Sequence, residues 1–152
     1  MLAPYPGWEN FLQLAREVVD ALPDTTREGG FDAILVRYID RIALPAQEPI
    51  ELATWLTVLP RRPTSMPARA RELQFITRSS DADGTEANLR IVTAGMDPEG
   101  RPLLLYDLLM SCFAGDEAVG VEEWEAVVER LHTRQRSIFE DSITDALRAL
   151  FV

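Results

Sequence analysis

Apolar residues in the first third of the chain follow a helical pattern and then an extended one. Residues 8–22 place apolar side chains three and four positions apart, which predicts an amphipathic helix that ends at Pro23. The next apolar run, residues 31–44, is rich in β-branched and aromatic residues and has no Gly or Pro, so it predicts a strand. Residues 46–60 predict a short helix with Trp55 among its apolar contacts.

The middle of the chain predicts three strands joined by tight turns. Residues 71–78 and 87–95 alternate between two faces, and residues 79–86 between them are rich in residues that tolerate a left-handed backbone. Residues 97–100, Asp-Pro-Glu-Gly, are typical of a type I turn. The run over residues 101–113 is almost continuously apolar, which predicts a central strand or one covered on both faces.

The C-terminal part predicts one long helix, from Val121 to about Leu150, which would be about 40 Å long. A break near residues 141–145 is the alternative, because Ser142 or Thr144 could cap a second, shorter helix. The order of elements predicts an α+β fold. We expect an antiparallel meander sheet of about four strands, with an N-terminal helix and a long C-terminal helix packed on it, in a single domain over residues 1–152.

The charge of the chain restricts the chemistry it can perform. It has 25 acidic and 15 basic residues, a formal net charge of -10, and no lysine, so chemistry that depends on lysine is excluded. An acidic chain of this kind repels nucleic acid. No apolar run approaches the roughly 20 residues that span a bilayer, and residues 1–10 do not resemble a signal peptide. We therefore expect a cytoplasmic protein with neither nucleic-acid nor membrane partners.

Three stretches of the sequence resemble a known family. The first is Tyr5-x-Gly7-Trp8, the second is the strand motif Arg37-Tyr-Ile-Asp-Arg-Ile42, and the third is a C-terminal helix with Leu131, His132, Phe139, Ile143 and Thr144. Together they resemble a sporadically distributed family of uncharacterised prokaryotic proteins, and the resemblance covers most of the chain. Asp40 stands where the family usually has Asn. The family is usually longer at its N-terminus, so this chain resembles its C-terminal part, and the resemblance implies a fold without implying a reaction.

Polar residues interrupt two of the predicted strands. By strand alternation, Asp40 shares the more apolar face with Tyr38, whereas Arg37 and Arg41 lie on the opposite face. A buried carboxylate needs a partner, and Asp107 among its leucines has the same requirement. We interpret Asp40 and Asp107 as structural carboxylates that are hydrogen-bonded locally. The alternative is an acid pair or a ligand anchor.

The single histidine and the single cysteine are the only candidates for a nucleophile–base pair. Nothing in the spacing of His132 and Cys112 orients one toward the other, and no nucleophile-elbow motif is present. We interpret His132 as a structural residue that bridges the last helix to the sheet. The sequence predicts no catalytic residues, no metal ligands and no cofactor.

Basic residues gather in one loop of this acidic chain. Arg61, Arg62, Arg69 and Arg71 have no acidic residue between them. With Arg37 and Arg41 they are the candidate partner-binding residues, suited to an acidic protein or a phosphate group. The alternative is a solvated loop.

The sequence supports three functional hypotheses. The first is a non-catalytic protein-interaction or accessory module with a protein partner or a homo-oligomeric state. A defence- or immunity-linked role is assigned to this module by analogy alone. The second is a small-ligand-binding domain with an apolar pocket between helix and sheet, lined by Trp55, Phe75 and Tyr106. The third is an enzyme of unknown type. A closed apolar pocket between helix and sheet would favour the second hypothesis over the first.

Overall fold

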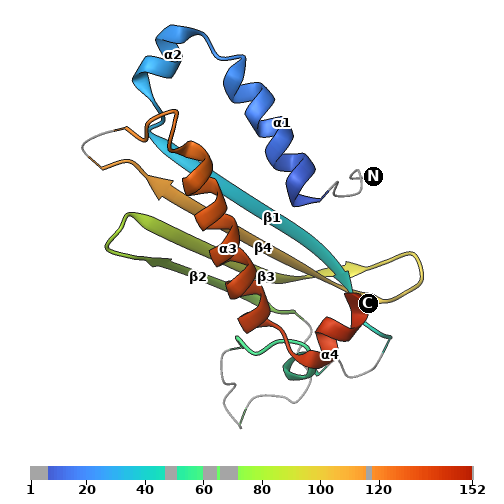
Figure 1. Ribbon diagram of the computed structural model, residues 1–152. Helices are drawn as coiled ribbons and strands as arrows, with labels where there is room; N and C mark the ends of the chain where they lie inside the picture. The colour runs from blue at the N-terminus through green and yellow to red at the C-terminus, as the bar shows by residue number, and fades with distance from the viewer. Residues whose placement is uncertain (1–6, 47–50, 60–64, 66–71, 116–117, 152) are drawn as a thin grey trace.

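The computed structural model describes residues 7–46, 51–59, 65, 72–115 and 118–151 (Figure 1). The elements, in chain order, are α1 (Trp8–Asp20), α2 (Asp24–Gly29), β1 (Ala33–Ala43), the 3-10 turn η1 (Leu52–Thr54), β2 (Gln74–Ser80), β3 (Thr85–Met96), β4 (Pro102–Phe113), α3 (Trp124–Ser142), α4 (Asp145–Arg148) and the 3-10 turn η2 (Ala149–Phe151). The protein has the predicted α+β fold, with an antiparallel four-stranded sheet, an N-terminal helix and a C-terminal helix.

The strands lie in the order β1-β4-β3-β2, and every neighbouring pair is antiparallel. β2, β3 and β4 follow one another as a meander, whereas β1 pairs with β4 and forms the opposite edge. The predicted turn at residues 97–100 is present, since the Gly100 amide donates to the Asp97 carbonyl oxygen at 3.0 Å. The other hairpin loop is shorter than predicted and covers residues 81–84. Its last residue, Gly84, has a φ of 77°, a conformation that favours glycine.

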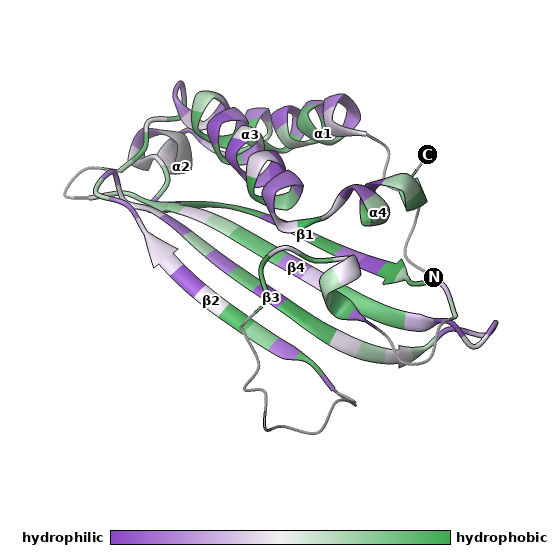
Figure 2. Cartoon of the chain, turned by 90° about the horizontal axis from the view of Figure 1, so that it is seen from below, coloured by the Kyte–Doolittle hydropathy of each residue, from purple (hydrophilic) through white to green (hydrophobic). Residues whose placement is uncertain are grey.

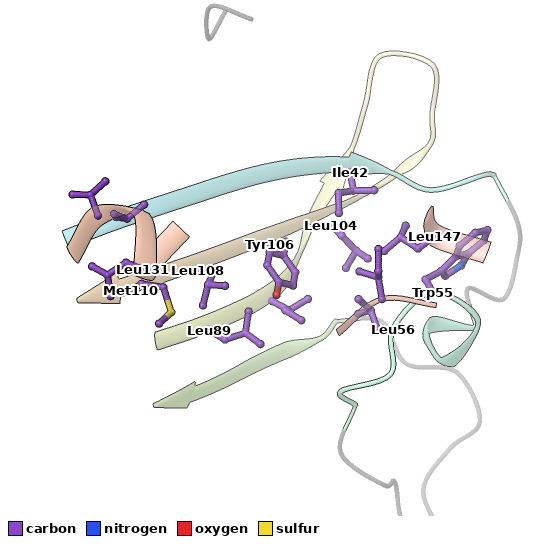
Figure 3. Close-up of a cluster of buried hydrophobic side chains, with 14 of the residues drawn as sticks. Ile42, Trp55, Leu56, Leu89, Leu104, Tyr106, Leu108, Met110, Leu131 and Leu147 are labelled. Carbon is purple, nitrogen blue, oxygen red and sulfur yellow. The ribbon is translucent and has the colours of Figure 1, made fainter. Parts of the chain in front are cut away.

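All the helices lie on one face of the sheet (Figure 2). α3 crosses β1 and β4, and the space between helix and sheet is filled by side chains (Figure 3). Leu131 of α3 packs with Leu108 and Met110 of β4, and all three are fully buried. Near the end of α3, the ring of Phe139 meets Tyr106 edge-on, with centroids 5.1 Å apart. In the described part of the chain, no helix is long and apolar enough to cross a membrane.

The sequence predicts a helix over residues 46–60. The structure describes residues 46 and 51–59 of this range, and for them the prediction is wrong. Only the three-residue turn η1 is helical, and Leu56 forms an isolated antiparallel bridge with Ile143. The Thr144 amide donates to the Trp55 carbonyl, and the Thr57 amide donates to the Ser142 carbonyl. Pairing with a segment almost 90 positions away therefore replaces the local helical hydrogen bonds.

The C-terminal helix is broken, so the alternative with a second capped helix is confirmed and the uninterrupted helix is wrong. α3 ends at Ser142, and Ile143 is extended, with φ -110° and ψ 153°. Thr144 then caps α4, because its Oγ1 accepts a hydrogen bond from the Leu147 amide at 3.3 Å. The break returns the chain to the sheet, where Leu147 becomes fully buried. Residues 24–29 also form a short helix, α2.

Leu108 offers a direct test of the helix-to-sheet core. We expect Leu108→Ala to lower the free energy of unfolding by about 2–5 kcal/mol, because the side chain is fully buried and its loss leaves a cavity. Met96→Ala is the matched control, since Met96 is 60% exposed on the same sheet and its truncation should change stability by less than about 0.5 kcal/mol. Urea unfolding of both variants gives the comparison. Equal losses would contradict this placement of the core.

Candidate functional site

The face of the sheet opposite the helices carries no helix of the described chain, and we call it the open face. Strand register and alternation place one set of side chains on it: Ala33, Leu35, Arg37, Ile39, Arg41 and Ala43 of β1; Leu103, Leu105, Asp107, Leu109, Ser111 and Phe113 of β4; Glu86, Asn88, Arg90 and Val92 of β3; and Gln74, Ile76, Arg78 and Ser80 of β2. Half of this set is aliphatic or aromatic. An uncovered face with this composition is a candidate site for a partner.

Large apolar side chains on the open face reach solvent. Leu35 and Ile39 of β1, Ile76 of β2 and Phe113 of β4 are among the exposed large hydrophobic residues, and Leu105 and Leu109 between them are partly buried. Because single exposed apolar residues are ordinary and adjacent ones are not, the grouping of these residues on one face distinguishes it from a normal protein surface.

An ion pair lies at the centre of the open face. Asp107 is 7% exposed, and Arg37 donates to both of its oxygens, Nε to Oδ1 at 2.8 Å and Nη2 to Oδ2 at 2.7 Å. This bidentate bond holds the pKa of the Asp107 carboxyl below its usual range, despite its burial. It also fixes the guanidinium, whose side chain is still 55% exposed and keeps further N–H groups directed at solvent.

Arg90 lies on the other side of the same carboxylate. The register places Arg90 of β3 directly opposite Asp107, and Ile39 and Ile76 flank this pair on the two edge strands. The positive charge of Arg90 also lowers the pKa of Asp107. Among the described residues, none forms a salt bridge with Arg90, Arg41 or Arg78.

The open face has a charge opposite to that of the chain. Four arginines and two carboxylates, Asp107 and Glu86, give it a formal charge of +2, whereas the whole chain carries -10. In charge and polarity, this basic and apolar surface is complementary to an acidic surface that also carries apolar side chains.

Arg90, Arg78 and Ile76 were not among the residues singled out from the sequence. Strand alternation does group Arg90 with Val92. That pattern does not specify which strands lie side by side, however, so it cannot predict that these residues lie close to Asp107. The proposed basic loop, Arg61, Arg62, Arg69 and Arg71, lies outside the described residues.

His132 lies on the helix-covered side. Its Nδ1 is 2.9 Å from the hydroxyl of Tyr38 on β1, and its ring stacks on Trp8 of α1, with centroids 3.7 Å apart and planes within 9°. The Trp8 Nε1 donates to Glu129 at 3.0 Å. Burial lowers the pKa of His132, which keeps the ring neutral near neutral pH. His132, which belongs to α3, therefore links this helix to α1 and to β1.

His132 and Cys112 are not neighbours. Cys112 is buried opposite Ile34, and His132 lies over Tyr38, four residues or about 13 Å further along the strand. In the described part of the chain, no group of three or more His, Cys, Asp or Glu residues is placed to hold a metal ion. Trp55 and Tyr106, two of the three residues expected to line a ligand pocket, are instead packed in the core (Figure 3).

Asp40 differs from its expected role. Its carboxylate, half-buried beside Tyr106, has no hydrogen bond or ion pair with a described residue, although a local partner was expected. Burial alone raises the pKa of Asp40. Burial is also the main reason that the pKa of Tyr106 rises to about 12, and the negative charge of Asp40 contributes to that rise.

Comparisons with protein-family models, with curated proteins and with solved structures gave no match for this chain. The resemblance described from the sequence therefore rests on its motifs alone.

Asp107→Asn tests the ion pair of the open face. The folded-state pKa of Asp107 is lowered, so its carboxylate stabilises the fold above the unfolded-state pKa of about 3.9, and this contribution is lost as pH falls through the folded-state pKa. We expect the variant to be less stable than the parent at neutral pH, with a difference that shrinks below about pH 4. Thermal melting across this range measures it. A difference that stays constant down to about pH 2 would contradict the assignment.

Asp40→Asn should have the opposite effect. The folded-state pKa of Asp40 is raised, so ionisation of its carboxylate reduces stability as pH rises from the unfolded-state pKa through the folded-state pKa. The amide is neutral, so we expect the variant to melt higher than the parent at neutral pH, and the difference to disappear below about pH 4. A lower melting temperature at neutral pH would show that the carboxylate has a stabilising partner.

Proposed function

We propose that this protein is a non-catalytic interaction module that binds an acidic protein partner through the open face. The observation that carries the proposal is the pairing of exposed apolar side chains with a positive charge, on one face of a protein that is otherwise strongly acidic. The partner contributes apolar side chains to Ile39 and Ile76 and carboxylates to Arg37 and Arg90. A cytoplasmic accessory role, including a defence- or immunity-linked one, is compatible with this activity.

The fixed guanidinium of Arg37 supports the proposal. A bidentate ion pair holds Arg37 in one conformation before binding, so a partner that bonds to it loses less side-chain entropy. Arginine is also one of the residue types that most often dominate binding energy when apolar neighbours exclude water from it. The apolar residues on both sides of this pair can provide that exclusion.

The size of the open face supports a specific complex. Four strands about 4.8 Å apart and up to about 37 Å long cover about 700 Å², close to the roughly 800 Å² that each partner buries in a standard interface. Two copies stacked face to face would bring together eight arginines and four carboxylates. Because that excess of like charge opposes contact, a different and acidic protein fits this face better.

Site-specific photo-crosslinking in the native cells tests the proposed function. A photoreactive residue in place of Gln74, beside Ile76 on the open face, should yield an adduct with one protein, identified by mass spectrometry. The same residue in place of Ser137, exposed on α3, is the matched control and should not give this adduct. Equal yields from the two positions would contradict the assignment of the face.

The purified partner then allows a quantitative test. Arg90→Glu should weaken its affinity roughly tenfold or more, because the change replaces an attraction with a repulsion inside the interface. Arg136→Glu makes the same change in net charge on the exposed side of α3 and should leave the affinity within about twofold, since rim and remote charges contribute little. Similar losses in both variants would show that the partner responds to net charge rather than to this face.

A further inference from the structure

The outer edge of β1 has unused hydrogen-bonding groups. The Leu44 amide donates to Pro102, and the Ala114 amide donates to Asp32, so the even-numbered residues of β1 direct their backbone groups toward β4. The odd-numbered residues, from Ala33 to Ala43, therefore direct their N–H and C=O groups away from the sheet. In the described part of the chain, no backbone group bonds to them. A free strand edge of this length is a template for another strand.

An apolar stripe of α1 lies on the same side of the molecule. Phe11, Leu14 and Val18 are exposed, and their spacing of three and four residues places them on one side of the helix. Each residue of a helix turns by about 100°, so the stripe lies roughly opposite Arg16. Arg16 donates to Glu125 of α3 at 2.9 Å. The stripe therefore points away from α3, and α1 itself runs beside β1 (Figures 1 and 2).

We infer that this side of the molecule binds a second copy of the chain, with the two β1 strands pairing antiparallel across a twofold axis. Overlap along the full strand centres the pairing on Tyr38. Arg37 then lies opposite Ile39 of the second copy, and Arg41 lies opposite Leu35. No arginine lies directly opposite an arginine, and every free backbone group of residues 33–43 gains a partner.

The same register places the apolar surfaces beside each other. His132 contacts both Trp8, at the start of α1, and Tyr38, in the middle of β1. The start of α1 therefore lies near the middle of β1, and the helix flanks the first half of the strand. The antiparallel arrangement brings that half beside the second half of the other strand. Near this second half, Phe151 contacts Phe139, which contacts Tyr106 opposite Asp40. The α1 stripe of one copy thus meets the exposed Leu150 and Phe151 of the other.

The size of this surface fits a dimer. A strand of 11 residues is about 37 Å long, and the sheet and helix layers together are about 20 Å deep, so each copy can bury about 700 Å², near the standard for a stable complex. The opposite edge is a weaker candidate. β2 has seven residues, and Ile76 is its only exposed large apolar side chain.

Sedimentation equilibrium of the whole chain tests the inference. We expect twice the chain mass of 17.1 kDa at micromolar concentrations. Leu14→Glu should weaken self-association by roughly 100-fold, because it places an unpaired charge in the seam. Ile39→Pro should also give monomers, since it removes an outward N–H while the β1–β4 ladder stays intact, an arrangement that edge strands tolerate. Circular dichroism verifies that both variants fold.

Ile76→Glu is the matched control. Ile76 is 57% exposed and Leu14 is 61% exposed, so the two changes are alike, but the two residues lie on opposite sides of the sheet. The control should leave the dimer intact. A monomeric parent, a dimer that survives Leu14→Glu and Ile39→Pro, or a dimer that is lost only in Ile76→Glu would each overturn the inference. Leu14 is not on the open face, so Leu14→Glu separates self-association from binding of the acidic partner.

Discussion

Packing of α3 across β1 and β4 is the interaction on which the rest of the structure depends. Leu131 on the helix and Tyr106, Leu108 and Met110 on the strand are all nearly inaccessible to solvent, and together they join α3 to the central strand β4. This packing divides the sheet into a covered face and an open face. Because α3 ends at Ser142, the chain can turn back, and Leu147 then closes the far end of the core with Trp55 and Leu56.

The open face results from this one-sided coverage. β4 is central and apolar on both sides, so its second side, with Leu105 and Leu109, stays partly exposed in the described chain. Asp107 would be unfavourable there without a partner, and Arg37 stabilises it from the neighbouring strand. The same ion pair that stabilises the buried carboxylate also fixes the conformation of an exposed arginine. Under the proposed function, one contact would thus provide both stability and recognition.

The arrangement also places the residues that the two other functional hypotheses named. A ligand-binding domain needs space between helix and sheet, and in the described residues the rings of Tyr106 and Phe139 occupy that space. His132 and Cys112, the candidate nucleophile–base pair, lie apart. His132 stacks on Trp8 and binds Tyr38, while Cys112 lies at a different position along the sheet. Among the described residues, the half-buried carboxylate of Asp40 has no hydrogen bond or ion pair, and the packing does not explain its role.

Local sequence determined most of the elements of this protein, and only the tertiary structure decided how their faces are used. The two-residue alternation placed Arg37 and Arg41 opposite Asp40, and Thr144 marked the start of a second helix, because side-chain direction and helix capping depend on neighbours within a few residues. The pairing of Arg37 with Asp107 joins residues 70 positions apart, and it required β1 to lie beside β4. The bridge from Leu56 to Ile143 likewise replaced a helix that the local spacing favoured. Strand order, helix coverage and the open face arise from long-range packing, and a periodic pattern of apolar residues does not specify which partner will cover it.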